Sequence, residues 1–171
     1  MEQQTQQKPQ LQKPNFKQNK QRPRKDDDGF DSRIINIRRV SRMYKGGRRM
    51  RMSVFVVVGD RKGRVGLGLG KGADVALAQS KAVEKAKRSM ITVNMKGSTI
   101  PHESLVKERA TKVLLKPAAP GTGLIAGATV KAILEVAGVK DILSKILGST
   151  NQINTAHATF NALKGLRAAR L

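Results

Sequence analysis

Cysteine and tryptophan are both absent from this 171-residue sequence. Without a thiol, the chain can form no disulfide, no thiolate-bound metal site and no cysteine nucleophile. Aromatic residues make up only 3% of the chain, so any core must be built from aliphatic side chains. The same scarcity argues against a protein that stacks single-stranded bases on aromatic side chains. Recognition of a folded nucleic acid through its backbone and shape fits this composition better.

Long apolar runs are missing as well. No stretch approaches the roughly 20 residues that a membrane-spanning helix needs. The N-terminal residues lack the apolar centre of a secretory signal, and Asp26, Asp27 and Asp28 interrupt the acid-poor composition typical of a transit peptide. We therefore expect a soluble protein that stays in the compartment where it is made and has no membrane partner.

Acidic side chains are few: 12 Asp and Glu stand against 34 Lys and Arg, which gives a net charge of +22. The excess is uneven, with net +3 over residues 1–30, +13 over 31–97 and +6 over 98–171. A folded segment with thirteen surplus positive charges repels itself and needs a polyanion to neutralise it. RNA or DNA is the leading candidate, because each neutralised phosphate also releases condensed counterion.

Residues 1–30 consist mainly of Gln, Lys, Pro and Asn and contain few apolar side chains. Such a segment cannot bury enough surface to offset its ordering entropy. We therefore predict a disordered basic arm. A solvated tail without a specific role and an arm that holds nucleic acid both fit this composition.

Residues 31–97 predict three antiparallel strands followed by a helix. Strands are expected around residues 35–40, over 50–58, where apolar side chains alternate, and over 64–71. Gly46-Gly47 and the segment 59–63 supply the turns. In the last strand the glycines of RVGLGLGK indicate that another backbone approaches closely or that the strand bends.

A helix is predicted from Asp74, as its N-cap, to about residue 90. Its expected apolar stripe consists of Leu77, Ala78, Ala82, Val83 and Ala86. Three strands and a helix in this order form the core of a double-stranded-RNA-binding-like module, which reads helix shape rather than base sequence.

Residues 98–171 predict a second, compact α/β domain with a short basic tail. A strand at 91–95 lies just before this domain, and a strand at 112–116 leads into a Pro- and Gly-rich loop at 117–123. Helical segments are then expected at 126–137, 141–147 and 153–166, the last after a turn and N-cap region at 148–151. The predicted fold class is therefore α+β, with two small α/β domains.

Neither a cofactor, nor a metal, nor catalysis is expected. The stretch from Gly66 to Lys71 lacks the spacing of a nucleotide-binding P-loop, and Gly121, Gly123 and Gly127 do not match the dinucleotide fingerprint. His102 and His157 are isolated in sequence, and the few acids are interleaved with bases, as in ordinary surface ion pairs. We expect tight turns and close packing at the glycines, and no enzyme.

Basic residues crowd the two predicted turns and the strands beside them. A run of charge is usually a solvated face, but here compensating acids are almost absent and most of the cations are Arg, which binds phosphate in bidentate fashion. We therefore favour RNA contact over simple solvation. The candidate RNA-binding residues, including two turn glycines and the lysine that ends the third strand, are Arg38, Arg39, Arg42, Lys45, Gly46, Gly47, Arg48, Arg49, Arg51, Arg61, Lys62, Arg64 and Lys71.

Several stretches closely resemble one family, the bacterial-type small-subunit ribosomal protein S5, and they follow its order over about residues 31–166. The first group lies in the strands and turns already described: Val40-Ser41-Arg42, Lys45-Gly46-Gly47-Arg48-Arg49, Val56-Val57-Val58-Gly59-Asp60 and Gly63-Arg64-Val65-Gly66. The second group begins at Leu115-Lys116-Pro117 and runs through Gly121-Thr122-Gly123, Ile125-Ala126-Gly127, Leu134-Glu135-Val136-Ala137-Gly138 and Leu147-Gly148-Ser149-Thr150-Asn151.

The resemblance implies a C-terminal βαβ-type domain with a left-handed crossover, and binding to 16S-type rRNA in the body and neck of the small subunit. It implies ribosomal proteins S4 and S8 as neighbours, with Gly123 and Lys131 on the S4 side, where translational accuracy is influenced. Val40, Ser41 and Arg42 would lie in a hairpin that faces the head near the spectinomycin site. mRNA near its entry channel is a further expected contact.

A free-standing RNA chaperone or DNA-compacting factor would have a similar composition, and only the ordered family resemblance argues against it. A nucleotide-dependent enzyme is a third class, which the glycine spacings do not support.

Overall fold

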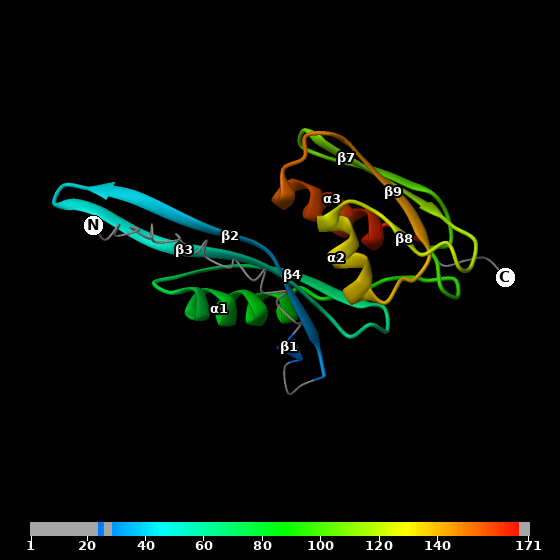
Figure 1. Cartoon of the computed structure of the whole chain (residues 1–171), viewed down its shortest axis with the longest axis horizontal. Coiled ribbons are helices and arrows are strands. Elements are labelled where there is room, and N and C mark those ends of the chain that lie inside the picture. The colour runs from blue at the N-terminus through cyan, green and yellow to red at the C-terminus, as the bar shows by residue number, and fades with distance from the viewer. Residues whose placement is uncertain (1–23, 26–28, 168–171) are drawn as a thin grey trace, which may run out of the picture.

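The structure is a computed structural model that describes residues 24–25 and 29–167. It has four layers: helix α1, a five-stranded sheet, the helices α2 and α3, and a four-stranded sheet (Figure 1). The predicted α+β fold with two small α/β parts is thereby confirmed. In the described residues, no helix has both the length and the apolar character needed to cross a membrane.

The first sheet has the strand order β1-β2-β3-β4-β5, and every neighbouring pair is antiparallel. Alternation along β3 explains its place in the core: Val54, Val56 and Val58 pack towards α1, whereas Phe55 and Val57 pack towards the second half of the chain. The strands are β1 (Arg24–Lys25), β2 (Asp31–Tyr44), β3 (Gly47–Gly59), β4 (Arg64–Gly72) and β5 (Ile91–Thr92).

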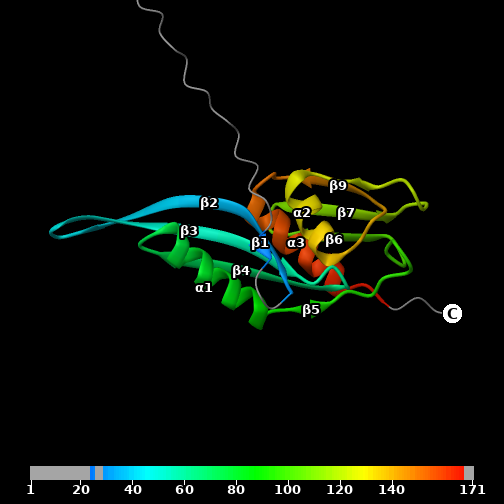
Figure 2. The same cartoon turned by 60° about the horizontal axis from the view of Figure 1, so that its bottom comes forward.

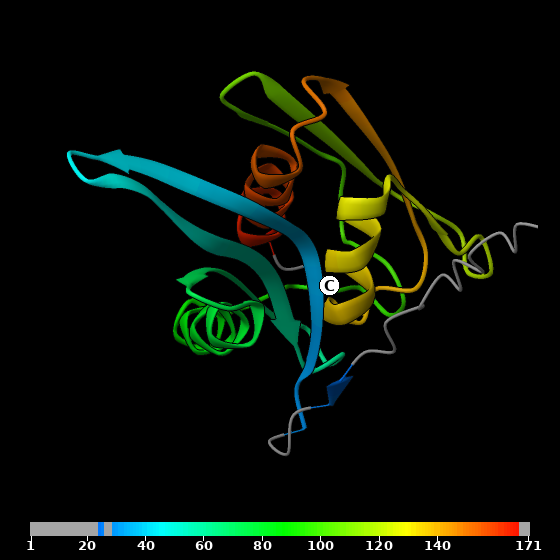
Figure 3. The same cartoon turned by 60° about the vertical axis from the view of Figure 1, so that its left-hand side comes forward.

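Strands β2 and β3 run well beyond the rest of this sheet. The end of β4, Gly72, pairs with Met52, but β2 and β3 continue to pair as far as Tyr44 and Gly47. Every residue from Ile37 to Arg51 is exposed. We call this two-stranded segment, residues 37–51, the ribbon; it projects from the layered body in Figures 1 and 3.

Helix α1 (Val75–Arg88) lies directly on β4 through a row of alanines facing a row of glycines. A Cβ atom on Gly68 would lie only 1.9 Å from the carbonyl oxygen of Ala82, and one on Gly70 only 2.0 Å from that of Ala78. The predicted close approach of another backbone is thus confirmed, and that backbone belongs to the chain's own helix.

One detail of the helix prediction was wrong and one was confirmed. Leu77 does not belong to the buried stripe, because it is 51% exposed; the stripe consists of Ala78, Ala82 and Ala86, with Val83 packed against the same cluster. Asp74 occupies the predicted N-cap position, and its side chain accepts no capping hydrogen bond. Only small side chains can face the glycines at this short distance, which explains the purely alanine contact.

The second sheet has the order β6-β7-β9-β8, in which β8 and β9 pair in parallel and the other pairs are antiparallel. Helix α2 (Ala128–Ala137) connects β8 to β9, so these elements form a βαβ unit, and α3 (Gln152–Lys164) follows. Both helices lie on the side of this sheet that faces the first sheet (Figure 2). Its strands are β6 (Ser104–Glu108), β7 (Thr111–Pro117), β8 (Leu124–Ile125) and β9 (Ile142–Gly148).

The prediction of a helical stretch at 141–147 was wrong, because this segment is strand β9. Its residues alternate between a covered side, with Ile142 buried, and an outer side, with Leu143 and Leu147 exposed. A short apolar run does not by itself separate helix from strand. Strand β6 was not predicted, and of the strand expected at 91–95 only β5 exists, as the edge of the first sheet.

The two halves share one hydrophobic core rather than touching as separate bodies. Phe55, Val57 and Leu67 of the first sheet belong to the same buried cluster as Leu134 of α2 and Leu163 of α3. The turn after β3 also packs on the end of α2, because the Arg61 N–H donates to the Val136 carbonyl at 3.0 Å and the Gly63 N–H to that of Ala137 at 2.9 Å. A bidentate ion pair, Arg33 with Glu135, joins β2 to α2.

The folded part begins earlier than residue 31. Strand β1 pairs with Asp31 and Ser32 of β2, and Phe30 packs against the cluster between α1 and the sheet. Arg24, Lys25 and Phe30, from the segment expected as a disordered arm, are thus part of the described structure. Residues 1–23 and 26–28 of the expected arm lie outside the described residues.

Candidate RNA interface

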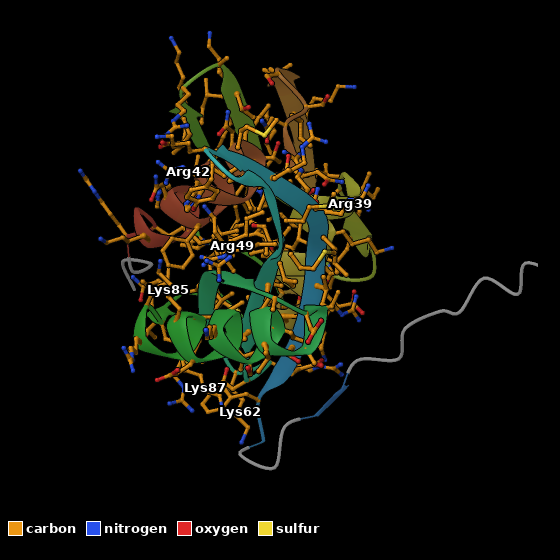
Figure 4. The ribbon with its side chains drawn as sticks, turned by 90° about the vertical axis from the view of Figure 1, so that its left-hand side faces the viewer. Arg39, Arg42, Arg49, Lys62, Lys85 and Lys87 are labelled. Atoms are coloured by element: carbon orange, nitrogen blue, oxygen red, sulfur yellow. The ribbon has the colours of Figure 1, made fainter. Side chains whose placement is uncertain are left out.

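The pairing register divides the cations of the ribbon between its two faces. Directly opposed residues of antiparallel strands share a face, and so do residues two apart in one strand. Arg42 is opposite Arg49 and Val40 is opposite Arg51, so Arg42, Arg49 and Arg51 lie on one face. Arg39, one residue from Val40, lies on the other face, and Figure 4 shows Arg39 on the far side of the ribbon from Arg42 and Arg49.

The face that carries Arg42 and Arg49 is hollowed, and we call it the hollow face. The hollow has a volume of about 340 Å³, and its lining consists of Val40, Ser41, Arg42, Tyr44, Arg49, Arg51 and Lys71. The Arg42 guanidinium lies 5.6 Å from the centre of the Tyr44 ring, which holds it over the aromatic face. Within the described residues none of these four cations has a carboxylate partner. The hollow is therefore suited to an anion such as a phosphate group.

Cations at the turn between β3 and β4 are paired with acids, unlike those that line the hollow, although the sequence predicted RNA contact for both. The Nε of Arg61 donates to Asp31 at 2.9 Å, and the Nε of Arg64 donates to Asp60 at 2.7 Å. Burial alone raises the pKa of Asp60, but the Arg64 guanidinium and the N–H groups of Lys62 and Arg64 outweigh it and lower that pKa. Two of the three cations at this turn thus hold the fold together.

A second basic surface, which the sequence did not predict as a site, lies around α1. Phe30 is flanked by two cations, because the Arg64 guanidinium and the Lys87 amine lie 5.4 and 5.7 Å from its ring centre. Lys81 and Lys85 are exposed on the same helix, and Figure 4 shows Lys85 and Lys87 around α1. Lys81 and Lys85 are four residues apart and therefore share a helix face, and this spacing was the sequence signal from which the surface could have been predicted.

Gly123 and Lys131 lie in the second half of the chain, away from the ribbon. The Gly123 N–H donates to the Asp141 carboxylate at 2.9 Å, as does the Gly121 N–H at 3.0 Å. The Ser98 hydroxyl and these N–H groups lower the pKa of Asp141. Gly123 has a φ of +77°, and Lys131 is exposed in the first half of α2. Asp141 therefore fixes the loop that presents Gly123.

Within the described part of the chain, no group of three or more His, Asp or Glu side chains could hold a metal ion. His157 lies instead beside the buried Phe55, with ring centres 5.8 Å apart. His102 is exposed next to β6 and close to Glu103 in sequence.

The two turn glycines of the ribbon are expected to differ in their tolerance of a side chain. Gly47 has a φ of +139°, which L-residues rarely adopt, whereas Gly46 has no such φ, and neither has an atom within 4 Å of a built Cβ. Gly47→Ala should cost about 1–2 kcal/mol of local backbone strain and weaken the RNA binding expected of the ribbon several-fold, because the tip cations are displaced. Gly46→Ala should bind like the unmodified protein. Filter-binding titrations compare the two variants, and equal affinities would contradict the prediction.

Comparison with known proteins gives matches over both halves of the chain. A family model described as "Ribosomal protein S5, N-terminal domain" matches residues 30–94, and "Ribosomal protein S5, C-terminal domain" matches residues 106–170. The small ribosomal subunit protein uS5 of Thermus thermophilus is 58% identical over 138 residues, which cover 81% of this chain and 85% of that protein. The uS5 proteins of Thermotoga maritima and Treponema pallidum are each 52% identical, covering 80% and 84% of this chain and 77% and 84% of theirs.

Proposed function

Because this chain belongs to the ribosomal protein S5 family, a family of structural components of the small ribosomal subunit and not of enzymes, we propose that it binds 16S-type rRNA through the hollow face of its ribbon. Its place is the cytoplasmic small subunit, where it would stabilise the body and neck region.

The observation that carries this proposal is the hollow itself. Four cations converge on it and no acid lines it, so in the free protein these charges repel one another. A phosphate backbone would relieve that repulsion and release counterions. A two-stranded ribbon alone is only marginally stable in water, so RNA contact would also stabilise the segment that carries the cations.

The remaining contacts follow from the same family membership. Ribosomal protein S4 would lie against the loop at Gly123 and against Lys131, with S8 as a second neighbour and mRNA near its entry channel. Val40, Ser41 and Arg42 would face the head. The shared core and the Arg33–Glu135 ion pair connect α2 to the sheet that carries the ribbon. A change at the S4 side would therefore be passed to the rRNA contacts and influence translational accuracy.

Sedimentation tests the assignment against a loosely bound RNA chaperone. The endogenous protein in a lysate is run on a sucrose gradient at a magnesium concentration that keeps ribosomes intact, and the small subunits are then washed with moderate salt. We expect one copy per small subunit and resistance to the wash. Migration at the top of the gradient, or release by mild salt, would instead favour the chaperone.

A further inference from the structure

The second sheet has one face that no described element covers. Helices α2 and α3 pack on its inner side, and the outer side forms the surface of the fourth layer (Figures 1 and 2). Strand alternation and the pairing register assign its residues. The outer face consists of Leu105 and Lys107 of β6, Lys112, Leu114 and Lys116 of β7, Leu143, Lys145 and Leu147 of β9, and Ile125 of β8.

Apolar side chains on this outer face are unusually exposed. Leu105 is 59% exposed, Ile125 54%, Leu147 42% and Leu143 39%. They are not scattered, because Leu105 is directly opposite Leu114, and Leu143 lies between Lys116 and Ile125 in neighbouring strands. Opposed side chains of this kind are about 5 Å apart. Exposed apolar side chains that gather on one face and are bordered by polar ones are typical of an interaction surface.

Lysines are interleaved with these apolar residues. Lys107 is opposite Lys112, which is opposite Leu147, and Leu114 is opposite Lys145. The strands contribute no arginine and no acidic residue to the outer face. At its edge Lys116 pairs with Glu103, which precedes β6, at 3.4 Å, and within the described chain the other three lysines have no carboxylate partner. The hollow at the ribbon, in contrast, is lined by three arginines and one lysine.

We propose that the outer face docks an extended segment of another protein, in which acidic side chains are interspersed with apolar ones. The proposal rests on the proposed function, because that partner would be a protein of the same subunit. The acids would pair with Lys107, Lys112 and Lys145, while the apolar residues cover Leu105 and Leu147.

Other occupants match the outer face less well. RNA could neutralise the lysines, but phosphates offer nothing to bury the five exposed or half-exposed leucine and isoleucine side chains. The chain's own residues 1–23 carry five basic side chains and one acid, so the lysines would repel them. A second copy would bring two faces with lysines and no acids against each other, which costs free energy.

Photocross-linking from within the small subunit tests the proposal. The photoreactive residue p-benzoylphenylalanine replaces Leu105 in one variant and Leu147 in another, and small subunits that contain each variant are purified and irradiated. Leu77, exposed on α1, is the matched control position. We expect both outer-face positions to form an adduct with one protein peptide that contains interspersed acidic and apolar residues, and Leu77 not to form that adduct.

Charge substitutions then test the role of the lysines. In the Leu105 photoprobe background, Lys112→Glu with Lys145→Glu should reduce the adduct yield by about tenfold, whereas Lys112→Arg with Lys145→Arg should preserve it. Adducts to rRNA, to a second copy or to no molecule at all would overturn the proposal, as would an undiminished yield in the Glu variant. Incorporation of the photoprobe proteins into small subunits is scored separately. Failure to incorporate would overturn the proposed function and this inference together, whereas incorporation without a peptide adduct would overturn the inference alone.

Discussion

Replacing Gly68 by alanine is expected to lower the free energy of unfolding by about 3 kcal/mol or more. The added Cβ would lie 1.9 Å from the Ala82 carbonyl oxygen, 2.8 Å from the Ala86 nitrogen and 2.9 Å from the Ala82 carbonyl carbon. All three are backbone atoms of α1, so no side-chain rotation can relieve the overlap. The helix would have to move away from β4 and open the cluster that contains Val54 and Val56.

Thermal unfolding followed by circular dichroism measures this effect. For a chain of this size, the loss corresponds to a decrease in Tm of about 10 °C. Gly46→Ala is the control, because its Cβ would meet no atom within 4 Å and its Tm should stay within about 2 °C of the unmodified protein. The double variant Gly68→Ala with Ala82→Gly should show no recovery, since the overlap involves the Ala82 carbonyl and not its methyl group. Equal Tm values for Gly68→Ala and Gly46→Ala would contradict the packing described here.

The double variant Arg42→Ala with Arg49→Ala is expected to show the largest loss of rRNA binding. These two arginines oppose each other across the hollow face. If each contacts one phosphate, the slope of log affinity against log salt concentration should become shallower by between about 1.4 and 1.8. Losing these charge-assisted hydrogen bonds should cost about 1–3 kcal/mol of binding free energy in total. The affinity at moderate salt should therefore fall by about 10- to 100-fold.

Two charge-matched controls make this result specific. Lys107→Ala with Lys112→Ala removes the same charge from the outer face of the second sheet and should leave the slope unchanged. Arg39→Ala with Arg48→Ala removes two positive charges from the opposite face of the ribbon. This variant should change the slope less than the Arg42 and Arg49 variant does. Titrations with 16S-type rRNA at several salt concentrations provide all three slopes. Identical slopes in all variants would mean that net charge, and not the hollow face, determines binding.

Much of the fold was predictable because its signals are local. The alternation from Met50 to Val58 predicted β3, and the glycines of β4 predicted close backbone contact, which the alanines of α1 provide. Asn151 predicted the start of α3, and its side chain accepts the capping hydrogen bond from Ile153. Strand β9 was not predicted because its seven residues mix apolar and polar side chains in an order that fits both the helix and the strand period. Its pairing partner, β7, is distant in sequence.

For the candidate site, the sequence predicted the kind of residue and ligand but not which of the arginines are available to bind it. Excess arginine around two turns indicated phosphate binding, but nothing local distinguished the ribbon from the turn after β3. Arg61 and Arg64 are engaged by Asp31 and Asp60. In contrast, neither Arg42 nor Arg49 has a carboxylate partner among the described residues, and the Arg42 guanidinium lies over the Tyr44 ring. The difference depends on which acids the fold brings near. The basic surface on α1, in contrast, had a local signal in the spacing of Lys81 and Lys85.

The sequence by itself determined the class of partner, the aliphatic core, most of the strands and helices, and the family to which the chain belongs, because these depend on composition, periodicity and ordered motifs. Only the tertiary structure decided which face of the ribbon is hollow, which arginines are available to a ligand, and which sheet face remains uncovered. These features depend on strand register and on contacts between residues such as Arg33 and Glu135, 102 positions apart. Such contacts form only when the layers pack, since packing a common core fixes the relative position of segments that have no local preference for each other.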